Sequence, residues 1–153
     1  MEVTEKLLKE KFDEYNRMYF EGKLKNVKMG FISKSFKRTV GVFEFYIDKD
    51  GYFRYASIKV NKGIDWDGEK LRRILLHEMA HLSVTQKYKK NKKHGIAFIK
   101  ECKRIESQYN VKVWHSWMRK GYIDKPKSIF TLLFILCRNM ASLVKFRIIQ
   151  KII

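Results

Sequence analysis

The chain has 153 residues, about the length of one domain, and its 45% apolar content is enough for a single hydrophobic core. Lys and Arg number 34 against 16 Asp and Glu, and the net charge of +18 indicates either a polyanionic partner such as nucleic acid or a heavily solvated surface. An aromatic content of 14% argues against disorder, and two cysteines are too few for a disulfide framework.

The segment from Val3 to Phe20 is expected to form an amphipathic helix. Leu8, Phe12 and Tyr15 recur at spacings of four and three residues, and Gly22 provides a stop signal. The first residues are charged throughout and lack the apolar centre of a signal peptide, so we expect an intracellular protein.

Three segments that follow have the composition of β-strands, with many β-branched and aromatic residues. They cover residues 27–33, 38–47 and 52–60. A turn of sequence DKDG lies between the last two, so these two are expected to form a hairpin. We therefore predict a small antiparallel sheet of three strands.

A second helix is expected from about Glu69 to Thr85, with Asp67 as its N-cap. Its middle has almost no polar face, which is typical of a buried helix. The lysine-rich residues 87–93 are predicted to be a solvated loop. A third helix is then expected over about residues 95–109, with an inner stripe formed by Phe98, Cys102 and Ile105.

The second helix contains the sequence His77-Glu78-Met79-Ala80-His81, an H-E-x-x-H motif. Residues four apart lie on the same face of a helix one turn apart, so both imidazoles can reach one metal ion. A catalytic zinc site needs three protein ligands and leaves its fourth position open for water. Glu78 is placed to take a proton from that water, so the motif can supply both metal ligands and a general base.

The third zinc ligand must come from outside this motif. A metzincin would have a histidine at position 87, where this chain has Lys87. His94 is the better candidate, because it precedes the third helix and the adjacent Gly95 permits close backbone approach. Glu101 and, further along, Glu106 are the acidic alternatives on that helix, and Glu101 is the one to test.

In these features the chain resembles the SprT-like metallopeptidases. The resemblance runs from about Leu7 to Tyr109 and includes FDEYNRMYFEGKL at the end of the first helix, IKVN at the end of the hairpin, LRRILLHEMAHL and HGIAF. It implies an α+β fold of the minimal zincin type, in which the opening helix, the small sheet, the H-E-x-x-H helix and later helices form the domain. It also implies one zinc ion bound by His77, His81 and His94, with Glu78 as general base.

For the better known members of the family, the resemblance implies cleavage of DNA-bound or DNA-crosslinked proteins. Bacterial relatives often carry a four-cysteine zinc ribbon after the protease core, which this chain cannot form, so any DNA contact must use the core itself. Lysines between the metal ligands and the aromatic, basic segment after the third helix are the candidates for phosphate contact and base stacking. They are Lys87, Lys89, Lys90, Lys92, Lys93, Trp114, Trp117, Arg119 and Lys120.

Two regions are expected in the chain, a metallopeptidase domain over residues 1–125 and an apolar, basic tail over residues 126–153. The apolar run of the tail is shorter than the ~20 residues that span a bilayer and contains a charge, so we expect a packed or surface-lying helix.

The sequence thus predicts a DNA-associated zinc endopeptidase that acts on protein substrates. Two alternatives remain at this point. One is a nucleic-acid-binding module with a structural zinc site and no proteolysis, and the other is a metallopeptidase held to an anionic membrane by its tail.

Overall fold

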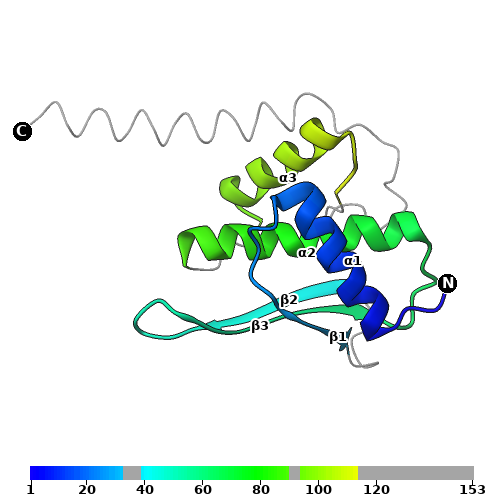
Figure 1. Cartoon of the computed structure of the whole chain (residues 1–153), viewed down its shortest axis with the longest axis horizontal. Helices are drawn as coiled ribbons and strands as arrows, with labels where there is room; N and C mark the ends of the chain where they lie inside the picture. Colours follow the sequence, from blue (N-terminus) through cyan, green and yellow to red (C-terminus); the bar gives the residue numbers. More distant parts are fainter. Residues whose placement is uncertain (33–38, 90–93, 114–153) are drawn as a thin grey trace, which may run out of the picture. The chain divides into compact units, whose positions relative to one another are not determined.

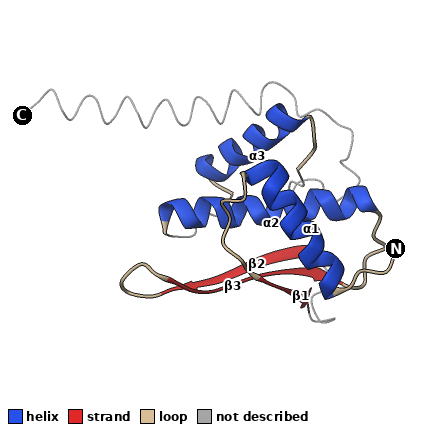
Figure 2. Ribbon diagram, viewed as in Figure 1, coloured by secondary structure: helices blue, strands red, loops and turns tan. Residues whose placement is uncertain are grey.

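The computed structural model describes residues 1–32, 39–89 and 94–113. Within them the chain forms one helix, three strands and two further helices, in that order. The helices lie on one face of the sheet (Figures 1 and 2). The predicted α+β class is therefore confirmed, while the expected boundary between residues 125 and 126 lies outside the described residues.

The first helix, α1, spans Glu5–Phe20. Its N-cap is Thr4, whose hydroxyl oxygen accepts a hydrogen bond from the backbone N–H of Leu7 at 3.1 Å. At the other end Asn16 donates to the Leu24 carbonyl and accepts from the Leu24 N–H, both at 3.1 Å. This pair of bonds fixes the chain where it leaves the helix and turns toward the sheet.

The sheet is mixed rather than antiparallel, with strand order β1-β3-β2. Strands β2 (Gly41–Ile47) and β3 (Phe53–Asn61) form the predicted antiparallel hairpin. Strand β1 (Lys28–Ile32) pairs with β3 in parallel. The expectation of an antiparallel sheet was wrong for β1. Strands β1 and β2 lie at opposite edges of the sheet, and β3, between them, runs parallel to β1 and antiparallel to β2.

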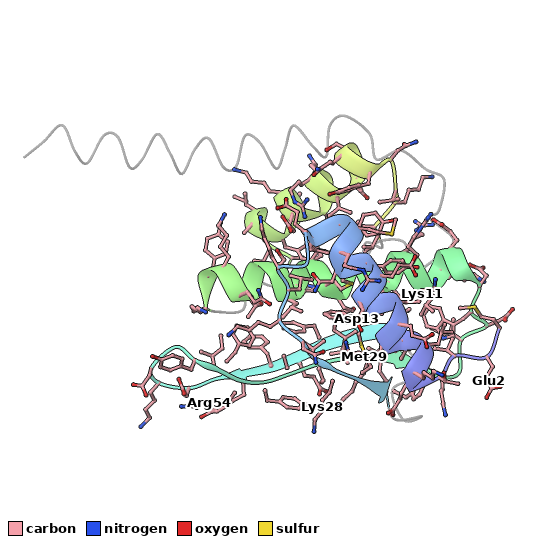
Figure 3. All side chains as sticks on the ribbon, viewed as in Figure 1. Glu2, Lys11, Asp13, Lys28, Met29 and Arg54 are labelled. Carbon is pink, nitrogen blue, oxygen red and sulfur yellow. The ribbon has the colours of Figure 1, made fainter. Side chains whose placement is uncertain are left out.

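Side chains alternate between the two faces of the sheet, as the pleat requires. Figure 3 shows Lys28 pointing away from the helices and the adjacent Met29 pointing toward them. Ile58 and Val60, both 0% exposed, place the central strand β3 against the helices. The hydrophobic core thus lies between the sheet and the helical layer.

The second helix, α2, spans Gly68–Tyr88 and lies over the sheet, with its axis along β2 and β3 in the view of Figure 1. Asp67 is its N-cap, as predicted, and accepts from the Lys70 N–H at 2.7 Å. The helix continues past Thr85, so Lys87 is helical and not part of a loop; Lys89, in the left-handed conformation, ends it. Five apolar side chains of its middle are 0% exposed, namely Leu75, Leu76, Met79, Ala80 and Leu82.

The third helix, α3, spans Ile96–Tyr109 and packs on α2. Phe98, Cys102 and Ile105 are its buried residues, which confirms the predicted inner stripe. Burial raises the pKa of the Cys102 thiol, as expected for a core cysteine. Among the described residues no helix is both long enough and apolar enough to cross a membrane.

Candidate metal centre

The H-E-x-x-H segment lies in the buried middle of α2. His77 is 5% exposed and Glu78 is 4% exposed, whereas His81, one turn later, is half-buried. The two imidazole centroids are 4.9 Å apart, as the four-residue spacing predicts. Apolar neighbours in the helix thus place the imidazole of His77 inside the protein and that of His81 at the boundary of the core.

His94 joins these two histidines from the start of α3. Its Nε2 atom lies 3.2 Å from Nε2 of His81 and 3.2 Å from Nε2 of His77. In the whole cluster the candidate ligand atoms lie within 4.8 Å of one another. The structure therefore brings together all three histidines that the sequence singled out.

The spacing of these nitrogen atoms fits a zinc ion. Zinc–nitrogen bonds of about 2.0–2.1 Å at tetrahedral angles place two ligand nitrogens about 3.3 Å apart. The observed separations of 3.2 Å agree with that value. Three imidazole nitrogens match the number of protein ligands in catalytic zinc sites, one fewer than closed structural sites have.

The protonation state of His81 also suits a metal ligand. Burial, and then the charge of His94, lower the pKa of the His81 imidazole from 6.5 to about 4. At neutral pH the ring is therefore uncharged, and a neutral imidazole is the form that binds a metal ion.

Phe98, in the first turn of α3, packs against all three imidazoles of the cluster. Its ring stacks on His81 with centroids 4.1 Å apart and meets His77 and His94 edge-on at 4.9 and 5.0 Å. Because Phe98 is 2% exposed, it cannot turn away without opening the core. The sequence indicated Phe98 as a core anchor but did not indicate that one ring contacts all three imidazoles.

Glu78 points toward the sheet, where its carboxylate lies against Gly41 at the start of β2. A Cβ atom at Gly41 would come within 2.9 Å of Glu78 Oε1. Gly41 was not among the residues that the sequence predicted for the site. The signal that could have found it was a glycine inside a strand pattern, which often marks a close approach of another group to the backbone.

The carboxylate of Glu101, the acidic alternative to His94, is hydrogen-bonded to residues outside the histidine cluster. It accepts hydrogen bonds from the Ser83 hydroxyl at 2.8 Å and from the Arg104 guanidinium at 3.0 and 3.1 Å. Burial opposes its ionisation, but these bonds outweigh burial and hold the pKa of the carboxyl below its ordinary value. Arg104 also donates to the Tyr19 carbonyl, so the group ties α3 to α1 and α2.

Of the residues expected to contact nucleic acid, the structure describes Lys87 and Lys89. Both are exposed at the C-terminal end of α2, the helix that carries His77 and His81. The others lie outside the described residues, namely Lys90, Lys92, Lys93, Trp114, Trp117, Arg119 and Lys120.

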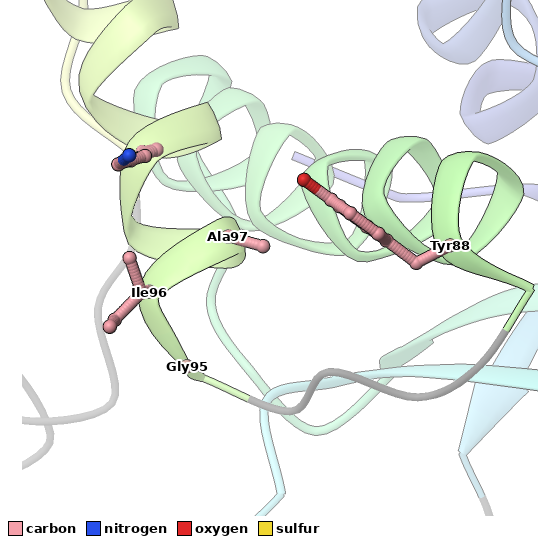
Figure 4. Close-up of a pocket in the computed structure, with 5 residues that line it drawn as sticks. Tyr88, Gly95, Ile96 and Ala97 are labelled. Carbon is pink, nitrogen blue, oxygen red and sulfur yellow. The ribbon is translucent and has the colours of Figure 1, made fainter. Parts of the chain in front are cut away.

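A pocket of about 330 Å³ lies between the end of α2 and the start of α3 (Figure 4). Tyr88 forms one wall, and Gly95, Ile96, Ala97 and Lys100 form the other. Gly95, one of its lining residues, directly follows His94 in the chain.

Comparison with known proteins gives one match. A model of the SprT-like family matches residues 8–120, a range that contains the three histidines and Glu78. No curated protein and no solved structure matches the chain significantly.

Proposed function

Because this chain belongs to the SprT-like family, we propose that it is a zinc endopeptidase that cleaves proteins bound or crosslinked to DNA. Family membership identifies a metallopeptidase-type domain. The observation that carries the proposal is the convergence of His77, His81 and His94 beside the buried Glu78. A carboxylate beside the metal ligands can act as a general base, which a hydrolytic zinc site needs and a structural zinc site does not.

The three histidines would hold the ion through their Nε2 atoms. A zinc ion bound there supplies a Lewis acid that polarises the scissile carbonyl and makes water more acidic. Glu78 accepts a proton from the attacking water as the water oxygen bonds to the carbonyl carbon. When the carbon–nitrogen bond breaks, Glu78 passes that proton to the leaving amine and regains its charge.

Strand β2 is the expected place for the substrate. It is an edge of the sheet, and among the described residues no strand pairs with its outer side. An extended peptide can add to such an edge through backbone hydrogen bonds. Since β2 begins at Gly41, against which the Glu78 carboxylate lies, a peptide on this edge would pass the general base.

The expected DNA contact rests on charge. The net charge of +18 attracts phosphate, and Lys87 is exposed six residues beyond His81, about 9 Å along the axis of α2. DNA held by Lys87 and Lys89 would therefore bring an attached protein close to the histidine cluster. This geometry supports a role for DNA in presenting the substrate.

Glu78→Gln tests the mechanism, since it keeps the shape of the side chain and removes its basicity. We expect full zinc content and cleavage of a DNA-bound protein reduced by about 10²–10⁴-fold. Glu69→Gln is the matched control, because Glu69 lies in the first turn of the same helix and pairs with Arg72. Undiminished cleavage by Glu78→Gln would end the proposed mechanism.

The same assay separates the enzyme from a nucleic-acid-binding module with a structural zinc site. Cleavage by the zinc-loaded protein is measured with and without DNA, beside a salt titration of DNA affinity. The proposed enzyme should cleave faster with DNA, and this stimulation should fade as salt rises. Steeply salt-dependent DNA binding without cleavage under any condition would favour the binding module.

A further inference from the structure

We propose that Gly41 is a positioning residue of the active site, whose missing side chain leaves the space that the Glu78 carboxylate occupies. The inference rests on the proposed role of Glu78 as general base. It extends the site from the H-E-x-x-H helix to the edge strand β2, and so joins the base to the strand expected to hold the substrate.

The contacts around Gly41 leave no room for a Cβ atom. An ideal Cβ would lie 2.8 Å from Ile74 Cγ1, 3.1 Å from Ile74 Cδ1 and 2.9 Å from Glu78 Oε1. Non-bonded carbon atoms rest about 3.5–4.0 Å apart, so these separations are repulsive. Any residue larger than glycine must therefore displace one of its neighbours.

The requirement for glycine at this position is steric and not conformational. Among the described residues the glycines with positive φ are Gly22 and Gly51, so the backbone of Gly41 is one that other residues can adopt. Gly30, in β1, provides the contrast, because a Cβ there would meet only Lys59 Cγ at an ordinary 3.8 Å. What distinguishes Gly41 is the close approach of α2.

The backbone at Gly41 is held in place from both sides. Gly41 is paired with Val60 in the β2–β3 ladder. Just before it, the Val40 carbonyl accepts from the backbone N–H of Asn61 at 3.0 Å. The Thr39 carbonyl accepts from the Asn61 side chain at 2.9 Å. The strand therefore cannot easily withdraw from α2 to make room.

Of the two neighbours, Glu78 is the one that can yield. Ile74 is 2% exposed and packed in the core, so moving it disturbs other side chains. Glu78 is also buried, at 4% exposed, but its carboxylate is the end of a longer, unbranched side chain and can turn aside at lower cost, whereas the Ile74 contact at Cγ1 lies next to a branched Cβ that is stiff at χ1. An added methyl group at position 41 should therefore push the general base out of place, while the histidines keep theirs.

The first test compares Gly41→Ala with Gly30→Ala. Gly41→Ala should retain one zinc ion per chain and a KM within about threefold of wild type. Its kcat should fall by about 10²-fold, the size of effect that a misplacement of 1 Å can have. Gly30→Ala should leave both kinetic constants unchanged. A kcat for Gly41→Ala equal to wild type would overturn the inference.

A second comparison separates displacement of Glu78 from strain against Ile74. In an Ile74→Ala background both isoleucine contacts are gone, and of the three nearest contacts the one with Glu78 Oε1 remains. Adding Gly41→Ala to this background should again lower kcat by about 10²-fold. Recovery of kcat in the double variant would assign the effect to Ile74 and overturn the inference.

Crystal structures of the wild type and Gly41→Ala supply a readout that needs no activity. We expect the Glu78 carboxylate to move by about 1 Å or more, with the three imidazoles unmoved. A carboxylate that keeps its wild-type position in the Gly41→Ala crystal would refute the inference. Absence of cleavage by the wild type would refute the proposed function instead, and the crystallographic comparison would still decide the position of Glu78.

Discussion

Replacing His94 with alanine removes one of three converging imidazoles and should weaken zinc binding by about 10²–10³-fold. Structural zinc sites with four ligands bind with about 10–16 kcal/mol, which corresponds to about 2.5–4 kcal/mol for each ligand. His94 is exposed, so its removal should leave the stability of the metal-free protein within about 0.5 kcal/mol of wild type. The loss is thus expected in metal affinity alone.

Glu101→Ala should behave in the opposite way. It removes the acceptor of the hydrogen bonds from Ser83 and Arg104, and we expect a loss of about 1–2 kcal/mol of stability. Zinc affinity should be retained, because the Glu101 carboxylate is turned to these two partners. The two variants therefore distinguish the loss of a metal ligand, expected for His94→Ala, from the loss of a carboxylate that stabilises the fold, expected for Glu101→Ala.

Metal competition against a chromogenic chelator measures zinc affinity, and urea unfolding with and without zinc measures stability. For wild type and Glu101→Ala, zinc should raise the urea concentration at the unfolding midpoint, since an ion that binds only the folded state stabilises it. For His94→Ala this shift should be much smaller. Wild-type zinc affinity in His94→Ala, together with zinc loss in Glu101→Ala, would show that the third ligand is Glu101.

Two further predictions concern Asn16, which lies away from the metal ligands, and His81, which is one of the candidate ligands and is partly buried. Asn16→Ala removes both hydrogen bonds to Leu24 and should cost about 1–3 kcal/mol in urea unfolding; an unchanged midpoint would contradict the role given to Asn16. The pKa of His81 lies near 4 in the folded protein and at 6.5 ordinarily, so between these pH values the unfolded chain binds the extra proton. The metal-free protein should therefore lose up to about 3 kcal/mol as pH falls from 6.5 to 4, and His81→Gln should flatten this dependence. Equal slopes for the two proteins would refute the burial of a neutral His81.

Local sequence signals predicted most of the helical part of the fold. The Asp67 N-cap and the apolar middle of α2 are properties of neighbouring residues, and both were expected. The end of α2 was placed too early, because a run of lysines suggests a loop although lysine is a good helix former. The parallel pairing of β1 was missed, since alternation within a strand does not indicate which strand lies beside it.

The candidate site also contains some residues that local sequence signals predict and others that only the tertiary packing brings together. His77 and His81 are related by one helical turn, so their proximity follows from the sequence alone. His94 could be suggested from its place before α3, and the structure brings it to the other two, while its role as a zinc ligand stays a prediction. The approach of Gly41 to Glu78 depends on how α2 packs against β2, which no local pattern specifies.

The outer side of β2, with which no strand pairs among the described residues, has a consequence for the behaviour of the protein at high concentration. An apolar edge strand of this kind can pair with the same strand of another copy, which is a common route to aggregation. The net charge of +18 opposes such encounters by mutual repulsion. At about 1 M salt, where charges are screened within about 3 Å, DNA attraction and this protection should disappear together, and the protein should begin to self-associate.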